Sequence, residues 1–277
     1  MCEVGKTFAN VDFYNKEIAK GIEDKLFFVN KLPKEYCIFV DFGCADGTLI
    51  NALVNCNNHK FNRYIGYDIS ETMIDIAKCH YHGPMNANVN FTSDWEEVKK
   101  ALWVPFRKKV LILSSVVHEV YSYGNEGTIK DFWDKVGDGW DYVVIRDMCL
   151  TADDENAGMS AELSDKIQLS RGTAYDEQII GFVNKWGDLQ HKKNALHFLL
   201  KYRWRLNWQR ELNENYFPIT VEEMLQKMQT ANYKINYLER FRVPFLDDCI
   251  YNDIGVVLPE DWFTHVKAIF AKNNKHN

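Results

Sequence analysis

The sequence lacks three features that would place the protein in a membrane, outside the cell or on a nucleic acid. No apolar run approaches the roughly 20 residues of a membrane span. The first residues carry neither the basic nor the apolar segment of a signal peptide. The net charge of −6 argues against a coat for nucleic acid or an anionic membrane, although it leaves room for a local basic patch. We therefore expect a cytoplasmic protein with no membrane partner, and a long nucleic acid is disfavoured.

Cysteine motifs are missing as well. The seven cysteines show neither a CxxC pair nor the spacing of a metal site, and they are scattered through apolar segments. An odd number of scattered cysteines is typical of reduced, mostly buried thiols. We expect no bound metal. The chain also contains no internal repeat and no low-complexity tract.

The chain does contain enough apolar material for a large core. Of its 277 residues, 46% are hydrophobic and 14% are aromatic, which argues against a disordered chain. We expect a single domain over residues 1–277. An amphipathic helix at 12–32, ended by Pro33, is expected to open it.

The first half of the chain alternates between short apolar segments and amphipathic segments. Strands are expected at 37–42, 64–69, 89–92, 109–115 and 142–147, with helices between them. The fourth of these strands is nearly all apolar, as a central parallel strand is. The alternation predicts an α/β fold with a doubly wound, mostly parallel sheet. Ligands of such sheets bind beyond the carboxyl ends of the strands.

The alternation stops after Leu150. Helices are expected at 160–170, 175–186 and 192–213, and we interpret residues 150–217 as a helical cap inserted above the strand ends. A helix that starts at Thr220 with the spacing of a capping box follows. Two final strands, at 233–241 and 264–271, are expected to form an antiparallel edge, with 242–262 as a long connection. The sheet would then have seven strands.

A glycine-bounded turn joins the first strand to its helix. After Asp41-Phe42 the chain reads Gly-Cys-Ala-Asp-Gly over residues 43–47. A dinucleotide fingerprint requires a second glycine where Ala45 stands, and Asp41 and Asp46 would repel a pyrophosphate. The Gly-Lys-Ser/Thr sequence of a nucleoside triphosphate site is also absent. The turn therefore favours a ligand with a positive centre.

A ribose fits the end of the second strand, where Asp68 can accept both sugar hydroxyls. Together these features resemble the Rossmann-like, class I S-adenosylmethionine-dependent methyltransferases. The resemblance covers residues 35–148 and, more weakly, the last two strands. The segments that carry it are Val40–Gly47, Tyr67–Ser70 with Asp68, the pair Ser93-Asp94, and Leu113–Glu119.

The resemblance implies a place for each part of the cofactor. Asp41 and the backbone of residues 43–47 would hold the methionine part, Asp68 the ribose, and Asp94 the adenine amino group. The backbone of Ser114 would lie at the sulfonium. Asp41 and Asp94 could instead only cap the helices that follow them. The cofactor-binding residues implied are Asp41, Gly43, Cys44, Ala45, Gly47, Asp68, Ile69, Ser93, Asp94 and Ser114.

His118 and Glu119 follow the fourth strand, where methyl transfer would occur. In small-molecule O-methyltransferases of this superfamily a His-Asp pair at this place acts as the base, and His118-Glu119 is similar to it. We therefore name both as catalytic candidates. The alternative is a histidine that only packs against the cofactor loop.

Four further residues are candidates for binding the acceptor: Tyr121, Asp147, Arg203 and Arg205. Asp147 could instead cap a helix or pair with Arg146. The two arginines belong to the basic and aromatic segment 201–210, which could also be an amphipathic helix with solvated arginines.

The sequence thus predicts an S-adenosylmethionine-dependent methyltransferase that acts on an oxygen or nitrogen of a small molecule or nucleotide. One alternative is a regulatory module that binds S-adenosylmethionine without catalysis. The other is an NAD-dependent oxidoreductase, against which the missing second glycine counts. The identity of the acceptor and the oligomeric state cannot be read from the sequence.

Overall fold

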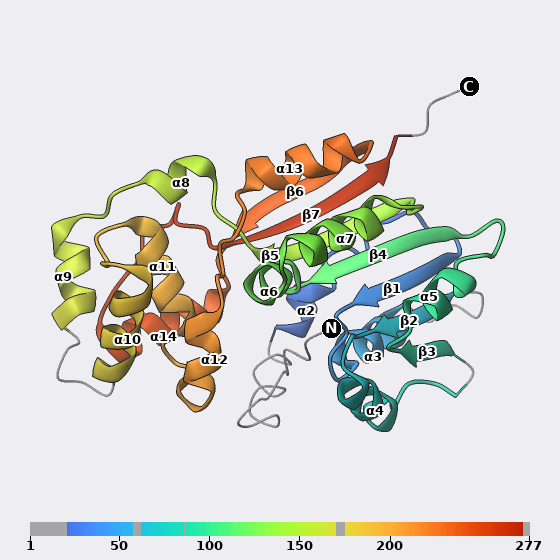
Figure 1. Ribbon diagram of the computed structural model, residues 1–277, viewed down its shortest axis with the longest axis horizontal. Coiled ribbons are helices and arrows are strands. Elements are labelled where there is room, and N and C mark those ends of the chain that lie inside the picture. The colour runs from blue at the N-terminus through green and yellow to red at the C-terminus, as the bar shows by residue number, and fades with distance from the viewer. Residues whose placement is uncertain (1–20, 58–61, 86, 170–174, 274–277) are drawn as a thin grey trace.

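The computed structural model describes residues 21–57, 62–85, 87–169 and 175–273. Figure 1 shows a twisted sheet flanked by helices and, beyond one end of the strands, a separate group of helices. The helix expected at 12–32 lies partly outside the described residues. Within them, one short helix, α2 (Ile22–Lys25), is formed there, and residues 26–31 continue as turns.

Seven strands form the sheet, in the order β3-β2-β1-β4-β5-β7-β6. Neighbouring strands are parallel except in the two pairs that involve β7, which is antiparallel to both β5 and β6. The predicted doubly wound, mostly parallel sheet with an antiparallel edge is confirmed. The strands are β1 (Cys37–Phe42), β2 (Arg63–Tyr67), β3 (Asn88–Thr92), β4 (Lys108–Ser114), β5 (Tyr142–Met148), β6 (Tyr233–Phe241) and β7 (His265–Lys272).

Helices cover both faces of the sheet, which explains why its strands are apolar on both sides. In β1, Ile38 and Val40 pack into the core on one face, whereas Cys37 and Phe39 pack into the core on the other. This alternation follows from the two-residue period of a strand. The first face is covered by α5 (Trp95–Ala101), α6 (Val117–Tyr123), α7 (Glu126–Gly137) and α13 (Val221–Thr230), and the second by α3 (Thr48–Cys56) and α4 (Glu71–His80).

A third hydrophobic core lies in the helical cap. The helices of the cap differ from the expected ones in two ways. The helix expected at 192–213 is broken at 202–207, which allows both Tyr202 and Trp208 to be buried. The expected connection 242–262 contains a helix whose Ile250, together with Val256 just after the helix, completes this core. The cap helices are α8 (Ala152–Asn156), α9 (Ala161–Leu169), α10 (Asp176–Trp186), α11 (Lys192–Lys201), η1 (Arg205–Asn207), α12 (Trp208–Asn213) and α14 (Pro244–Ile254).

The chain passes between sheet and cap four times, and these passages lie next to one another. It leaves after β5 at Leu150 and returns at Thr220, and the two residues form a parallel bridge. It leaves again after Phe241 and returns at Thr264, whose N–H donates to the carbonyl of Phe241 over 3.1 Å. The two insertions therefore form one unit above the carboxyl ends of the strands (Figure 1).

The predicted capping box at the start of α13 generates a stability prediction. The Thr220 hydroxyl accepts from the N–H of Glu223 over 3.2 Å, and Glu223 accepts from the N–H of Thr220 over 2.8 Å. Thr220→Ala should lower the free energy of unfolding by about 1 kcal/mol and the melting temperature by roughly 2 °C. Thr230→Ala, at the opposite end of α13, is the control and should change stability by less than about 0.5 kcal/mol. Equal effects of the two substitutions would contradict the capping role.

Candidate functional site

Parallel pairing brings the ends of four strands to one edge of the sheet. β1 pairs with β2 and β4, and β4 pairs with β5. Their carboxyl ends carry Asp41, Asp68, Ser114 and Asp147, the polar residues that the sequence singled out. The candidate site lies along this edge, facing the cap.

The turn after β1 adopts the backbone that its glycines permit. Gly43 and Gly47 have φ angles of 79° and 77°, in the left-handed region that favours glycine, and Ala45 between them has a φ of 45°. The N–H of Gly43 donates to the Tyr67 carbonyl at 2.7 Å, which fastens the turn to β2. A Cβ on Gly43 would lie 2.8 Å from the Val116 side chain just before α6. The turn and the start of α6 are therefore in direct contact.

Three carboxylates converge on this turn, and all are buried: Asp41, Asp46 and Asp68. The Asp68 carboxylate accepts from the N–H of Ala45 over 3.0 Å and from that of Ser70 over 2.9 Å. Burial raises the pKa of Asp41 to about 7; Lys25 of α2 opposes this shift, while Asp68 and Asp46 add to it. The turn therefore has a strong preference for positive charge.

The residues predicted to bind the cofactor differ in exposure. Ile69, directly after Asp68, is 74% exposed, although it is a large apolar residue at the edge of a buried strand. Cys44 is buried. Asp94 accepts from the N–H of Glu96 at 2.8 Å. It therefore caps α5, which was the alternative role considered for it. A role of Ser93 and Asp94 at an adenine stays a prediction.

His118 meets Asp147 inside the protein. The His118 Nδ1 atom lies 2.7 Å from Asp147 Oδ1. The Asp147 carboxylate also accepts from the N–H groups of Val117 and Met148, over 2.7 and 2.8 Å. His118 is 5% exposed and Asp147 is 3% exposed. Asp147 thus pairs with His118, although the sequence analysis assigned it to the acceptor. A carboxylate on Nδ1 leaves Nε2 as the atom that can exchange a proton.

The surroundings of His118 favour its protonated form. Burial lowers its pKa, but Asp147, Glu214 and Glu119 together outweigh burial and raise the pKa to about 9. Glu214 belongs to the segment after α12, and its Oε2 lies 3.9 Å from His118 Nε2. The histidine therefore lies between one carboxylate of the sheet and one of the cap.

Glu119 binds an arginine of the cap. Its carboxylate lies 3.1 Å from Nη2 of Arg210, and the same nitrogen lies 2.7 Å from Glu214. Tyr123 of α6 donates to Glu214 over 2.9 Å. Arg210 therefore joins the end of β4 to the cap at the point where His118 lies.

The sequence analysis missed the cap residues of this cluster. Glu214 lies beside His118, Arg210 contacts both Glu211 and Glu214, and Lys201 donates to the carbonyls of these two glutamates, each over 2.7 Å. Lys201 is fully buried. The only hint in the sequence is the density of charged residues between 201 and 214 around several aromatic residues.

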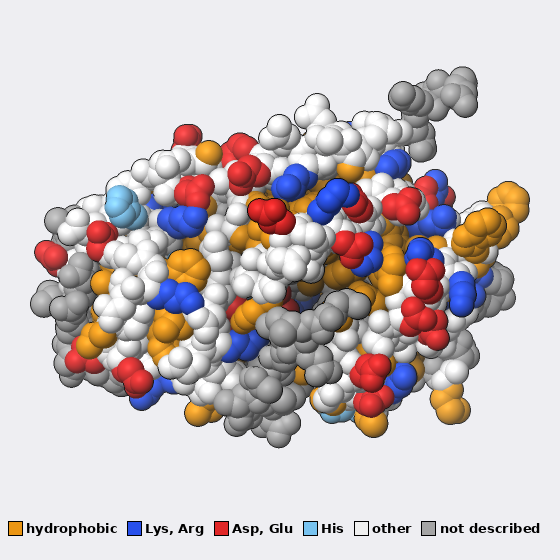
Figure 2. Space-filling view, in the orientation of Figure 1, with side chains coloured by type: hydrophobic (Ala, Val, Ile, Leu, Met, Phe, Trp, Pro, Cys, Tyr) orange, Lys and Arg blue, Asp and Glu red, His pale blue; other side chains and the backbone are white. Residues whose placement is uncertain are grey.

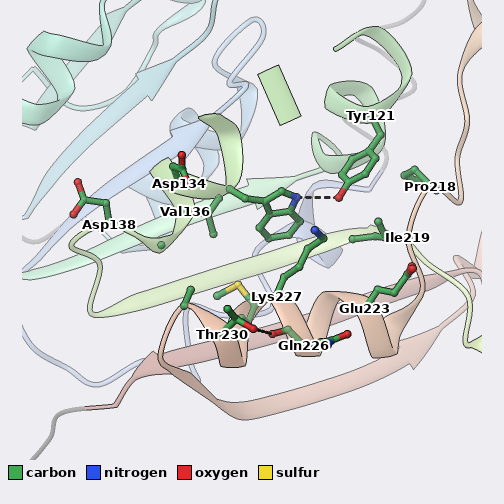
Figure 3. Close-up of a pocket in the computed structure, with 14 residues that line it drawn as sticks. Tyr121, Asp134, Val136, Asp138, Pro218, Ile219, Glu223, Gln226, Lys227 and Thr230 are labelled. Carbon is green, nitrogen blue, oxygen red and sulfur yellow. Dashed lines mark hydrogen bonds between the residues drawn. The ribbon is translucent and has the colours of Figure 1, made fainter. Parts of the chain in front are cut away.

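The structure places the other three predicted acceptor residues in different surroundings. Arg203 pairs with Asp253 of α14 over 3.0 Å, and Arg205 is exposed. Tyr121 accepts a hydrogen bond from Trp133 over 3.0 Å. It lines a cavity of about 880 Å³ between α7 and α13, with Lys227 on the opposite wall (Figure 3).

Among the described residues, no group of His, Cys, Asp or Glu side chains could hold a metal ion. No helix in the described part of the chain has the length and apolar character to cross a bilayer.

The fold is similar to those of solved methyltransferase structures. No protein-family model and no curated protein matches the chain. An O-methyltransferase family protein from Burkholderia thailandensis has a TM-score of 0.52 and 10% identity over 96% of this chain and 60% of its own. A SAM-dependent methyltransferase from Archaeoglobus fulgidus has a TM-score of 0.48 and 14% identity over 95% of this chain and 100% of its own. The plantazolicin methyltransferase BamL, solved with SAH, has a TM-score of 0.46 and 15% identity over 95% and 88%. With its sheet order and its single antiparallel strand β7, the chain has the Rossmann-like fold of the class I S-adenosylmethionine-dependent methyltransferases.

Proposed function

We propose that the protein is a methyltransferase that uses S-adenosylmethionine and acts on an oxygen or nitrogen of a small acceptor. The observation that carries this proposal is the convergence of Asp41, Asp46 and Asp68 on the left-handed turn at the carboxyl edge. Buried carboxylates attract a ligand with positive charge and repel a pyrophosphate. S-adenosylmethionine has a sulfonium, an ammonium and a ribose, so it matches these groups.

The residues at this edge fit the parts of the cofactor. Asp41 and the turn 43–47 would hold the methionine part, and Asp68, oriented by two backbone N–H groups, would bind the ribose. Ile69 is an exposed apolar side chain that an adenine ring could cover. When bound, the cofactor supplies an electrophilic methyl group on a sulfonium.

His118 is the proposed general base. Asp147 orients the imidazole through Nδ1, which leaves Nε2 to take the proton of an acceptor hydroxyl or amine. The sulfonium carries a positive charge, and its binding near His118 would lower the pKa of the imidazole and favour the neutral form. Glu119, which contacts Arg210, is assigned to positioning the cap rather than to catalysis.

The two alternatives differ from this proposal in testable ways. A non-catalytic module would bind S-adenosylmethionine without consuming it. An NAD-dependent oxidoreductase of the doubly wound type has its sixth strand parallel to the others, whereas β7 here is antiparallel to β5. The buried His118–Asp147 pair favours an enzyme over a module that only binds.

S-adenosylmethionine at about 100 times its dissociation constant should stabilise the protein by about 2.7 kcal/mol, measured as a rise in melting temperature. Asp68→Asn should remove most of this rise, because the neutral amide is a poorer acceptor for the ribose hydroxyls. Asp75→Ala, on the exposed face of α4, should retain it. An unchanged melting temperature of the wild-type protein at millimolar ligand would contradict the proposal.

The second prediction concerns Asp41 and pH. Its pKa is about 7 in the folded protein and 3.8 as a model value. As the pH rises through this interval, Asp41 loses its proton in the unfolded chain before it does so in the folded protein. The free energy of unfolding therefore falls as the pH rises. Asp41→Asn should stabilise the ligand-free protein by about 2–4 kcal/mol above pH 7, and by almost nothing below about pH 4. The same variant should lose the melting shift with S-adenosylmethionine. Urea unfolding across this pH range tests both statements.

The third prediction concerns the base. Transfer of labelled methyl groups to acceptors in a cell extract should increase as the pH rises toward 9, because His118 must be neutral to accept a proton. His118→Asn should lower the rate by about 10²–10⁴ and flatten the profile. Asp147→Asn should move the profile to lower pH, since it removes a carboxylate that raises the pKa of His118. A profile that does not respond to either substitution would exclude His118 as the base.

A further inference from the structure

The turn between α5 and β4 carries two large aromatic side chains on the outside of the molecule. Trp103 is 90% exposed and Phe106 is 99% exposed. Figure 2 shows apolar side chains projecting at the end of the molecule where Figure 1 places this turn, opposite the cap. Exposed aromatic residues that are adjacent in this way mark interaction sites more often than single exposed apolar residues do. We call residues 102–107 the aromatic tip.

The aromatic tip is anchored to the body of the protein. Leu102 and Val104, on either side of Trp103, pack against the core of the sheet face. Arg63 of β2 donates to the carbonyl of Ala101 over 3.0 Å. Phe106 has a φ of 63°, a backbone conformation that a bulky side chain rarely adopts. The two aromatic rings therefore project from a well-packed base.

Basic residues predominate in the segment of chain that carries the aromatic tip. The segment 99–109 contains Lys99, Lys100, Arg107, Lys108 and Lys109 and no acidic residue, although the whole chain has a net charge of −6. Two of the five also contact acids outside the segment, since Lys99 lies 2.5 Å from Glu96 and Lys108 lies 3.2 Å from Asp141. The segment nevertheless has a local excess of positive charge.

Although the net charge of the chain favours no membrane partner, we propose that the aromatic tip docks on the surface of an anionic phospholipid bilayer. Tryptophan prefers the interface between headgroups and acyl chains, and neighbouring lysine and arginine residues are attracted to anionic headgroups. The tip is convex, so it suits a soft surface into which two rings can insert. It lies at the amino end of β4, whose seven residues separate it from the His118 edge by roughly 23 Å. Docking would leave the candidate active site uncovered.

Sedimentation with lipid vesicles tests this proposal on the full-length protein. The wild-type protein should sediment with vesicles of phosphatidylcholine containing about 30% phosphatidylserine and much less with phosphatidylcholine alone. Trp103→Ser/Phe106→Ser should reduce the partition coefficient at least about tenfold, and about 0.5 M salt should weaken binding of the wild-type protein. The control, Tyr251→Ser/Val257→Ser, removes side chains that are 59% and 73% exposed on the cap and should bind as the wild type does.

Three results would overturn the proposal. The first is no sedimentation of the wild-type protein with anionic vesicles, and the second is undiminished sedimentation of the tip variant. The third is self-association of the wild-type protein, by sedimentation velocity, that the tip variant loses, because the tip would then be a contact between copies of the chain. An unchanged melting temperature shows that the tip variant is folded. The shift with S-adenosylmethionine, measured on the same variant, keeps this test separate from that of the proposed function.

Discussion

Burial of negative charge at one edge of the sheet is the constraint on which the candidate site depends. Asp41, Asp68 and Asp147 end three parallel strands, and none is more than 3% exposed. A buried carboxylate is strongly disfavoured unless it is paired or hydrogen-bonded. Backbone N–H groups bind Asp68, and backbone N–H groups with His118 bind Asp147. Asp41 depends on the charge of Lys25, and its pKa remains raised. Of the three carboxylates, Asp41 beside the glycine-bounded turn therefore has the least compensated negative charge.

Local patterns made the sheet predictable. Val110–Leu113 are all buried, and their unbroken apolar run already indicated a central strand. The capping residues Ser70 and Thr220 were readable for the same reason, since a cap depends on a contact within one turn of helix. The helix α14 was missed because its apolar residues are spread around the helix rather than gathered on one face, and because Pro244 at its start reads as a loop signal. It forms because its apolar residues meet a core built by the other insertion.

Only the part of the candidate site that depends on local sequence could be predicted. The other part depends on contacts between segments that are distant in the sequence. The turn 43–47 is a local signal, whereas Arg210 meets Glu119 across 91 positions of the sequence. Arg203 and Arg205 belong to the same basic segment as Arg210, and composition cannot distinguish them. The break between α11 and α12 decides which arginine reaches Glu119 and Glu214, and that break exists because of tertiary packing.

The position of the cap has two opposite effects on His118. The imidazole is 5% exposed, so an acceptor reaches it only if the contacts of Arg210 and Glu214 rearrange. Moving the cap away removes Glu214, which lowers the pKa of His118, and admits water, which raises it. Burial has the larger effect on this pKa, so such a movement would not lower the proton affinity of the imidazole. Asp147 stays in place because its carboxylate is bound to backbone N–H groups of the sheet edge. Asp147, the group that raises the pKa of His118 most, would therefore continue to favour the protonated imidazole if the cap moved.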